Sequence, residues 1–115
     1  MIDVRIFENP RRGNLGMVVK GHAGAGVKGE DLVCAGMSTL ACTAAMAAKM
    51  MYASGWLTRP PRIQLEDGDG QILVTPRKDK RDAVRMAFWT IQVGAFYLAQ
   101  SCPEYVRLEV MKVVA

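Results

Sequence analysis

The longest segment of this chain with almost no charge runs from Leu32 to Thr58, where Lys49 is the only charged residue. A helix of that length could cross a bilayer. The composition favours another interpretation, because small residues and methionine dominate and no dense block of leucine, isoleucine or phenylalanine is present. A helix that is apolar on all sides is more often buried within protein. We therefore predict a buried helix from Leu32 to about Ser54, closed by Gly55, and no membrane span.

The rest of the chain shows short alternating patterns and one further helix. Apolar and polar residues alternate in the strand segments, and glycine-rich or proline-containing turns separate them. The second helix is expected from about Lys80 to Ser101, with Asp79 as its N-cap and Pro103 marking its end. Strands are expected at residues 2–7, 15–20, 63–65, 72–75 and 106–111, with turns at 9–13 and 66–70.

The order of these elements is β-β-α-β-β-α-β, and 115 residues suffice for one domain, residues 1–115. Hairpins imply antiparallel pairing, and two long helices can cover one face of the sheet. We predict an α+β fold, a two-layer sandwich with a mostly antiparallel sheet. In so small a domain the first helix cannot be covered on every side. Part of its surface is therefore expected to bury against a partner subunit, which predicts a homodimer.

The charge distribution argues against nucleic acid as a direct partner. The net charge is +4, and the densest basic stretch is Arg77-Lys78-Asp79-Lys80-Arg81. Acidic residues interrupt this stretch, and no aromatic residues interleave with it for base stacking. We interpret it as a solvated helix start with mixed charges.

The thiols and the N-terminus indicate the compartment. Three cysteines at irregular spacing make no disulfide framework, and without a Cys-x-x-Cys pair a single histidine is too little for a usual zinc site. We expect no metal and no cofactor. The segment Met1-Ile2-Asp3-Val4-Arg5 lacks the features of a secretory signal. The cytoplasm, where thiols stay reduced, is the expected location.

The chemically capable residues gather around the only histidine, His22, which ends the second strand pattern. Cys34 follows twelve residues later and opens the long apolar run. A strand end and the start of the next helix usually meet at one edge of a sheet, so the loop between them can bring His22 back to Cys34. The two side chains could then form a thiolate–imidazolium pair. The alternative is structural, since buried cysteines are common and inert.

Asp31 and Ser38 flank the cysteine. With Asp31 as N-cap, Leu32 is the first helical residue and Cys34 the third, at the positive end of the helix dipole, which favours thiolate. Unpaired N–H groups of that first turn could hold an oxyanion. The Asp31 carboxylate opposes a thiolate, and its alternative role is to orient His22. Ser38 lies one turn after Cys34 on the same face, to hydrogen-bond near the site or to pack as a small residue.

Glycines and the remaining cysteines complete the candidate site. Four glycines, Gly21, Gly24, Gly26 and Gly29, predict a flexible loop that orders around a substrate. The loop has no Gly-Lys-Ser/Thr ending, which excludes a P-loop. Cys42 and Cys102 lie within apolar helix sequence, and both are expected to be buried.

A family resemblance sharpens this interpretation. Gly21-His22-Ala23, followed by Gly29-x-Asp31-Leu32-Val33-Cys34-Ala35-Gly36-x-Ser38, resembles the signature of the ribosomal-processing cysteine protease family, Prp, and the likeness covers nearly the whole chain. It implies a bacterial, cytoplasmic and homodimeric cysteine protease domain. The implied catalytic dyad is His22 and Cys34, with Asp31 and Ser38 in support.

The implied substrate is a short N-terminal extension of a large-subunit ribosomal protein, with an apolar, Phe-containing sequence before the cut, removed during ribosome assembly. The expected mechanism is hydrolysis through a thioester, with backbone N–H groups near the cysteine stabilising the oxyanion and no metal or cofactor. The alternative is a non-catalytic ribosome-associated binding protein that uses its basic surface.

Overall fold

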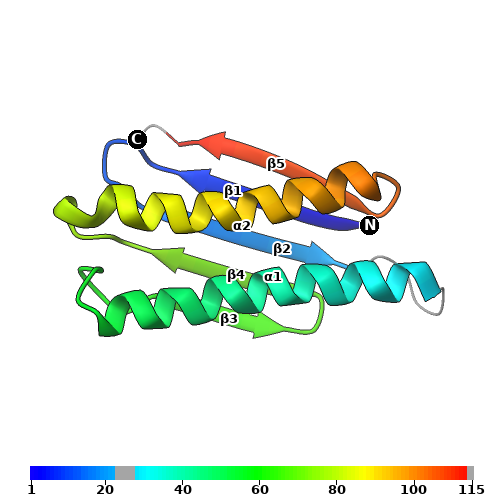
Figure 1. Cartoon of the computed structure of the whole chain (residues 1–115), viewed down its shortest axis with the longest axis horizontal. Coiled ribbons are helices and arrows are strands. Elements are labelled where there is room, and N and C mark those ends of the chain that lie inside the picture. The colour runs from blue at the N-terminus through cyan, green and yellow to red at the C-terminus, as the bar shows by residue number, and fades with distance from the viewer. Residues whose placement is uncertain (23–27, 114–115) are drawn as a thin grey trace.

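The computed structural model describes residues 1–22 and 28–113. Its elements follow the order expected from the sequence, and they form an α+β fold (Figure 1). The elements are β1 (Ile2–Glu8), β2 (Leu15–Gly21), α1 (Lys28–Ala53), β3 (Arg62–Glu66), β4 (Asp69–Val74), a 3-10 turn (Lys78–Lys80), α2 (Arg81–Ser101) and β5 (Val106–Lys112).

The sheet has five strands in the order β3-β4-β2-β1-β5. Both hairpins, β1–β2 and β3–β4, are antiparallel, and so is the central pairing of β2 with β4. Only β5 runs parallel to its neighbour, pairing Val106 with Ile2 of β1. Both helices lie across the same face of the sheet (Figure 1). The predicted two-layer, mostly antiparallel sandwich is confirmed.

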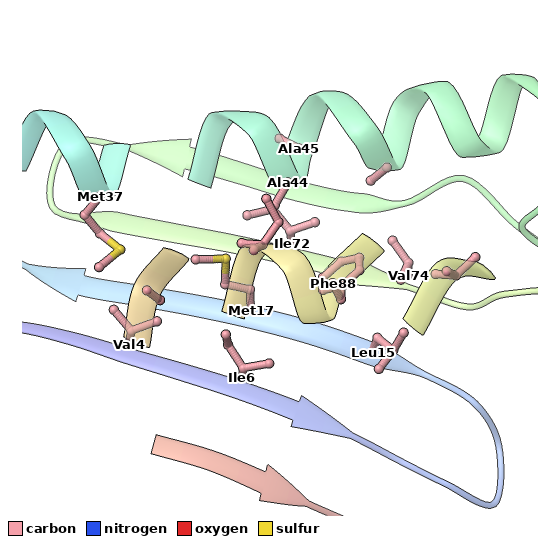
Figure 2. Packing of buried hydrophobic residues seen from close by; sticks show 14 of the residues in the cluster. Val4, Ile6, Leu15, Met17, Met37, Ala44, Ala45, Ile72, Val74 and Phe88 are labelled. Atoms are coloured by element: carbon pink, nitrogen blue, oxygen red, sulfur yellow. The ribbon is translucent and has the colours of Figure 1, made fainter. Parts of the chain in front are cut away.

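The core lies between the sheet and the two helices, because alternate strand residues face the helices. On β1, Ile2, Val4 and Ile6 are buried, and Val4 is only 1% exposed. The helices contribute Met37 and Ala44 from α1 and Phe88 from α2 (Figure 2). Four alanines on the inner face of α1 keep that face flat, which lets the helix approach the sheet closely. These are Ala41, Ala44, Ala45 and Ala48.

The other face of the sheet carries charged pairs instead of a second helical layer. Arg107 of β5 donates to Asp3 of β1 at 2.7 Å, and Arg5 lies 3.8 Å from Glu109. These pairs link the two parallel strands across the solvent face. The alternation on β1 therefore sends apolar side chains into the core and charged ones to water.

Helix α1 is buried on one face only, which agrees with the expectation that so small a domain cannot cover this helix on every side. Residues Leu32–Ala53 are long and apolar enough to cross a membrane. The inner face of this segment packs on the sheet. On the outer face Leu32 is 71% exposed, and Met46 and Met50 are also exposed.

The start of α2 differs from the prediction. The helix is preceded by the turn Lys78–Lys80, so Asp79 is not its N-cap, and Lys80 at the cap position makes no side-chain capping bond. Asp79 instead pairs with Arg77 at 3.4 Å. Arg81 donates to the carbonyl of Arg12 at 2.9 Å, tying the basic stretch to the β1–β2 turn.

Candidate active site

The strongest candidate site is a cavity of about 190 Å³ at the edge of the sheet where β2 ends. The same edge carries the N-terminal end of α1 (Figure 1). His22, directly after β2, and Cys34, on α1, both line this cavity. The fold thus places both residues in the lining of one cavity, while their pairing stays a prediction. Three structural units form the walls: the strands β1 and β2 (Ile2, Val19, Gly21, His22), helix α1 (Cys34, Met37, Ser38, Ala41, Cys42) and the β3–β4 hairpin (Leu65, Glu66, Asp67, Gly68, Asp69, Gly70).

Cys34 lies deeper within α1 than the sequence suggested. The helix begins at Lys28, so Cys34 is its seventh residue, and Asp31 is a helical residue and not the N-cap. The unpaired N–H groups of a helix belong to its first four residues, and the dipole effect falls off within the first turn. The helix terminus therefore contributes less to a Cys34 thiolate than predicted.

Asp31 and Ser38 occupy helical positions one turn before and one turn after Cys34. At spacings of three and four residues they share a helix face with the cysteine. Ser38 is exposed and lines the cavity, and its supporting role stays a prediction. The Asp31 side chain lies outside the described part of the structure, so its two alternative roles stay predictions.

His22 lies against the turn between β3 and β4, a neighbour that the sequence did not reveal. Its Nε2 is 4.0 Å from Asp67 Oδ1. The backbone N–H of Gly21 donates to the carbonyl of Gly68 at 2.9 Å, which joins the end of β2 to this turn. The sequence predicted a turn at residues 66–70. It did not predict the contact of this turn with His22, because that contact depends on the pairing of β2 with β4.

Acidic side chains from the same hairpin line the cavity. Glu66, Asp67 and Asp69 all face it. Asp69 Oδ1 is buried and has no hydrogen-bond partner. A buried acceptor of this kind is costly unless a donor reaches it. An N–H group of a peptide in the cavity would supply such a donor.

Several of the remaining expectations need correction. Gly21 is the last residue of β2 and Gly29 belongs to α1, so neither lies in a loop, while Gly24 and Gly26 fall outside the described residues. Cys42 is exposed on α1, where it lines both the cavity and the outer surface of the helix. Cys102 is half-buried at the end of α2, where it packs against the core. Among residues 1–22 and 28–113, no three metal-ligating side chains gather into a possible metal site.

Comparison with known proteins shows the family of this chain. The family model described as "Cysteine protease Prp" matches residues 1–107. The chain belongs to the cysteine protease Prp family. The protein is therefore a cysteine protease, and the alternative of a non-catalytic binding protein is set aside. A search of curated protein sequences found no significant match.

Solved structures agree with the Prp assignment. SMU.848 from Streptococcus mutans is 26% identical with a TM-score of 0.71, and the match covers 98% of this chain and 96% of that one. The essential ribosomal processing protease Prp from S. aureus, in complex with a substrate peptide, is 25% identical with a TM-score of 0.68. The coverage there is 96% of this chain and 99% of the S. aureus chain. A second S. aureus structure, with a covalently linked product peptide, is 26% identical with a TM-score of 0.67, over 96% of this chain and 99% of that one.

Proposed function

We propose that this protease uses Cys34 as nucleophile and His22 as general base to remove a short N-terminal extension from a bacterial large-subunit ribosomal protein. The observation that carries the proposal is the shared cavity: the only histidine of the chain and Cys34 line the same 190 Å³ space. His22 directly follows β2 and Cys34 belongs to α1, so only the fold places both in one cavity.

The chemistry follows from those two groups. The Cys34 thiol gives its proton to the His22 imidazole, and the thiolate sulfur attacks the carbonyl carbon of the scissile peptide bond. As the tetrahedral intermediate collapses, the C–N bond breaks and His22 passes the proton to the leaving amine. A water molecule, deprotonated by His22, then attacks the thioester and releases the carboxylate product and the thiol. No step requires a metal or a cofactor.

The oxyanion needs donors other than the backbone N–H groups near Cys34 that the sequence suggested. In a regular helix the N–H of a seventh residue is bonded to the carbonyl four residues earlier. Cys34 in α1 holds this position, so its own N–H is committed within the helix. We assign the oxyanion contact to Ser38, an exposed hydroxyl in the cavity lining one helical turn after Cys34.

The substrate class is supported by the cavity and by the relatives. The S. aureus structures hold a substrate peptide and a product peptide in a chain that covers this one almost completely. The cavity here combines apolar walls from Ile2, Val19 and Leu65 with the acidic hairpin. Apolar walls suit the Phe-containing segment that the family resemblance implies, and backbone acceptors and carboxylates suit the peptide N–H groups.

A cleavage assay tests the proposal. The substrate peptide of the S. aureus protease is incubated with the wild-type protein, with Cys34→Ala and with Cys102→Ala, and the products are identified by mass spectrometry. We expect one cut with wild type and Cys102→Ala, and none with Cys34→Ala. Cleavage by Cys34→Ala would refute the nucleophile. The same assay on the N-terminal peptide of the source organism's own ribosomal protein identifies the natural target.

We also propose that the protease acts as a cytoplasmic homodimer. The outer side of the helical layer is apolar in both helices. On α1 a shallow groove of about 530 Å³ runs along the exposed surface, lined by Ser38, Thr39, Cys42, Thr43, Met46, Ala47 and Met50. On α2 several large apolar residues are exposed, namely Met86, Trp89, Val93, Phe96 and Tyr97. Contiguous apolar surface of this kind favours association with a second copy.

A further inference from the structure

His22 has contacts that fix both its backbone and its side chain. The nitrogen of Met1 donates to the His22 carbonyl at 2.6 Å. On the other side, Gly21 donates to the Gly68 carbonyl at 2.9 Å. The residue is therefore held between the start of β1 and the β3–β4 turn. Its side chain is 56% exposed, so the ring is not enclosed by packing and is oriented by a few contacts only.

The imidazole occupies the space that a side chain at position 68 would need. A Cβ on Gly68 would lie 2.5 Å from His22 Nε2 and 3.2 Å from both Cδ2 and Cε1. A Cβ–nitrogen separation of 2.5 Å is too short for a real contact, and the two carbon–carbon separations of 3.2 Å are tighter than most real contacts. The edge of the ring thus rests directly on the backbone of the turn, and the absence of a Cβ is what lets it do so.

Asp67, the neighbouring residue in the turn, adds a charge beside the same nitrogen. Its Oδ1 lies 4.0 Å from His22 Nε2. The Asp67 side chain is 99% exposed, so water and salt screen the attraction strongly. Its contribution to the orientation of the ring is therefore smaller than that of the direct contact with Gly68.

We propose that the β3–β4 turn positions His22. The backbone of Gly68 supports the edge of the imidazole ring, and Asp67 is a weak charge partner. This inference rests on the proposed role of His22 as general base. With Nε2 against the turn, Nδ1 is the ring nitrogen left to take the proton of the thiol, because an imidazole has only two ring nitrogens. The turn thereby orients the ring of His22, and the role of Asp31 stays a separate prediction.

A competing explanation is that position 68 needs glycine only for its backbone. Its φ is +74°, a conformation that side chains disfavour. Gly55, after α1, offers a matched control: its φ is +77°, and a Cβ there would meet nothing within 4 Å. Alanine at either position carries the same backbone strain, whereas only alanine at position 68 displaces His22.

The experiment measures kcat and KM for the substrate peptide of the S. aureus protease. We expect Gly68→Ala to lower kcat by about 100-fold, the loss typical of a catalytic group displaced by about 1 Å. KM should change little, because the apolar walls remain. Gly55→Ala should keep wild-type kcat and lower Tm by the same few degrees as Gly68→Ala.

Two further variants separate strain from displacement. Asparagine tolerates positive φ better than other side chains, so Gly68→Asn should be the more stable variant and still lose kcat. It also keeps the test decisive if Gly68→Ala does not fold. Asp67→Asn should lower kcat only a few-fold, with the difference from wild type vanishing at high salt, and Asp67→Glu should restore most of the activity.

A second readout reports on the thiol itself. The rate at which iodoacetamide alkylates Cys34 at neutral pH, located by fragmentation mass spectrometry, should fall in Gly68→Ala and not in Gly55→Ala, since the ring no longer supports the thiolate. Equal kcat and equal alkylation rates in these two variants would overturn the inference alone. Unchanged kcat in His22→Ala would instead remove the proposed dyad, and this inference with it, so the two failures are distinguishable.

Discussion

Replacing Met37 by alanine tests whether a residue that lines the cavity also stabilises the hydrophobic core. Met37 lies on the inner face of α1, lines the cavity and is 1% exposed within the core cluster. Truncating a buried methionine to alanine costs about 2–5 kcal/mol, from the lost transfer free energy and the void left behind. Alanine has a higher helix propensity than methionine, so the substitution does not further destabilise the helix backbone.

The matched control is Met46→Ala on the same helix. Met46 is 60% exposed, so the same chemical change there should alter the free energy of unfolding by no more than about 0.5 kcal/mol. In a domain near this size 1 kcal/mol corresponds to about 4–8 °C in Tm. Met37→Ala should therefore melt at least about 6 °C below Met46→Ala.

The assay is thermal and urea denaturation followed by circular dichroism, at two protein concentrations. A dimer contact at Met46 would make its effect depend on concentration, whereas the effect of Met37 is intrinsic to the fold. Equal Tm values for the two variants at both concentrations would refute the reasoning, because they would show that α1 does not bury its Met37 face against the sheet.

Three further outcomes follow from the site and the surface. Cys34→Ala should lose all peptide cleavage and keep the wild-type circular dichroism spectrum, since alanine suits a helix; Cys102→Ala should cleave normally. His22→Ala should lower kcat on the order of 100-fold or more through the loss of acid–base help, measured with the same peptide, and an unchanged kcat would assign His22 a structural role. Light scattering should give a mass about twice the 12.6 kDa of one chain, and a monomer at micromolar concentration would contradict the homodimer.

The strands and helices could be predicted because each leaves a local periodic pattern. The alternation of Ile2, Val4 and Ile6 with charged residues is visible without any tertiary information, and β1 buries those three residues. The bounds were less predictable. Asp31 and Asp79 are good N-cap residues, yet α1 begins before Asp31 and α2 begins after a 3-10 turn that contains Asp79. A capping residue shows a possible helix start, but packing and the preceding chain decide which start is used.

The chemistry of the site was partly visible in the same way. The spacing of His22 and Cys34 around a strand end and a helix start indicates one sheet edge, and both residues line one cavity there. The signature around them carries the family, which the match over residues 1–107 confirms. The burial of Cys42 was predicted wrongly, because a helix with small apolar residues on every side gives no periodic signal for its outer face.

What the sequence determined by itself is the set of elements, their order and the residues able to do chemistry, since these depend on neighbours within a few positions. The tertiary structure alone decided what surrounds His22. Gly68 and Asp67 are more than forty residues away along the chain, and only the pairing of β2 with β4 brings the β3–β4 turn against the end of β2. Contacts between strands distant in sequence depend on sheet register, which no local pattern encodes. The contact of His22 with the β3–β4 turn therefore follows from the fold and not from the sequence motif around His22 and Cys34.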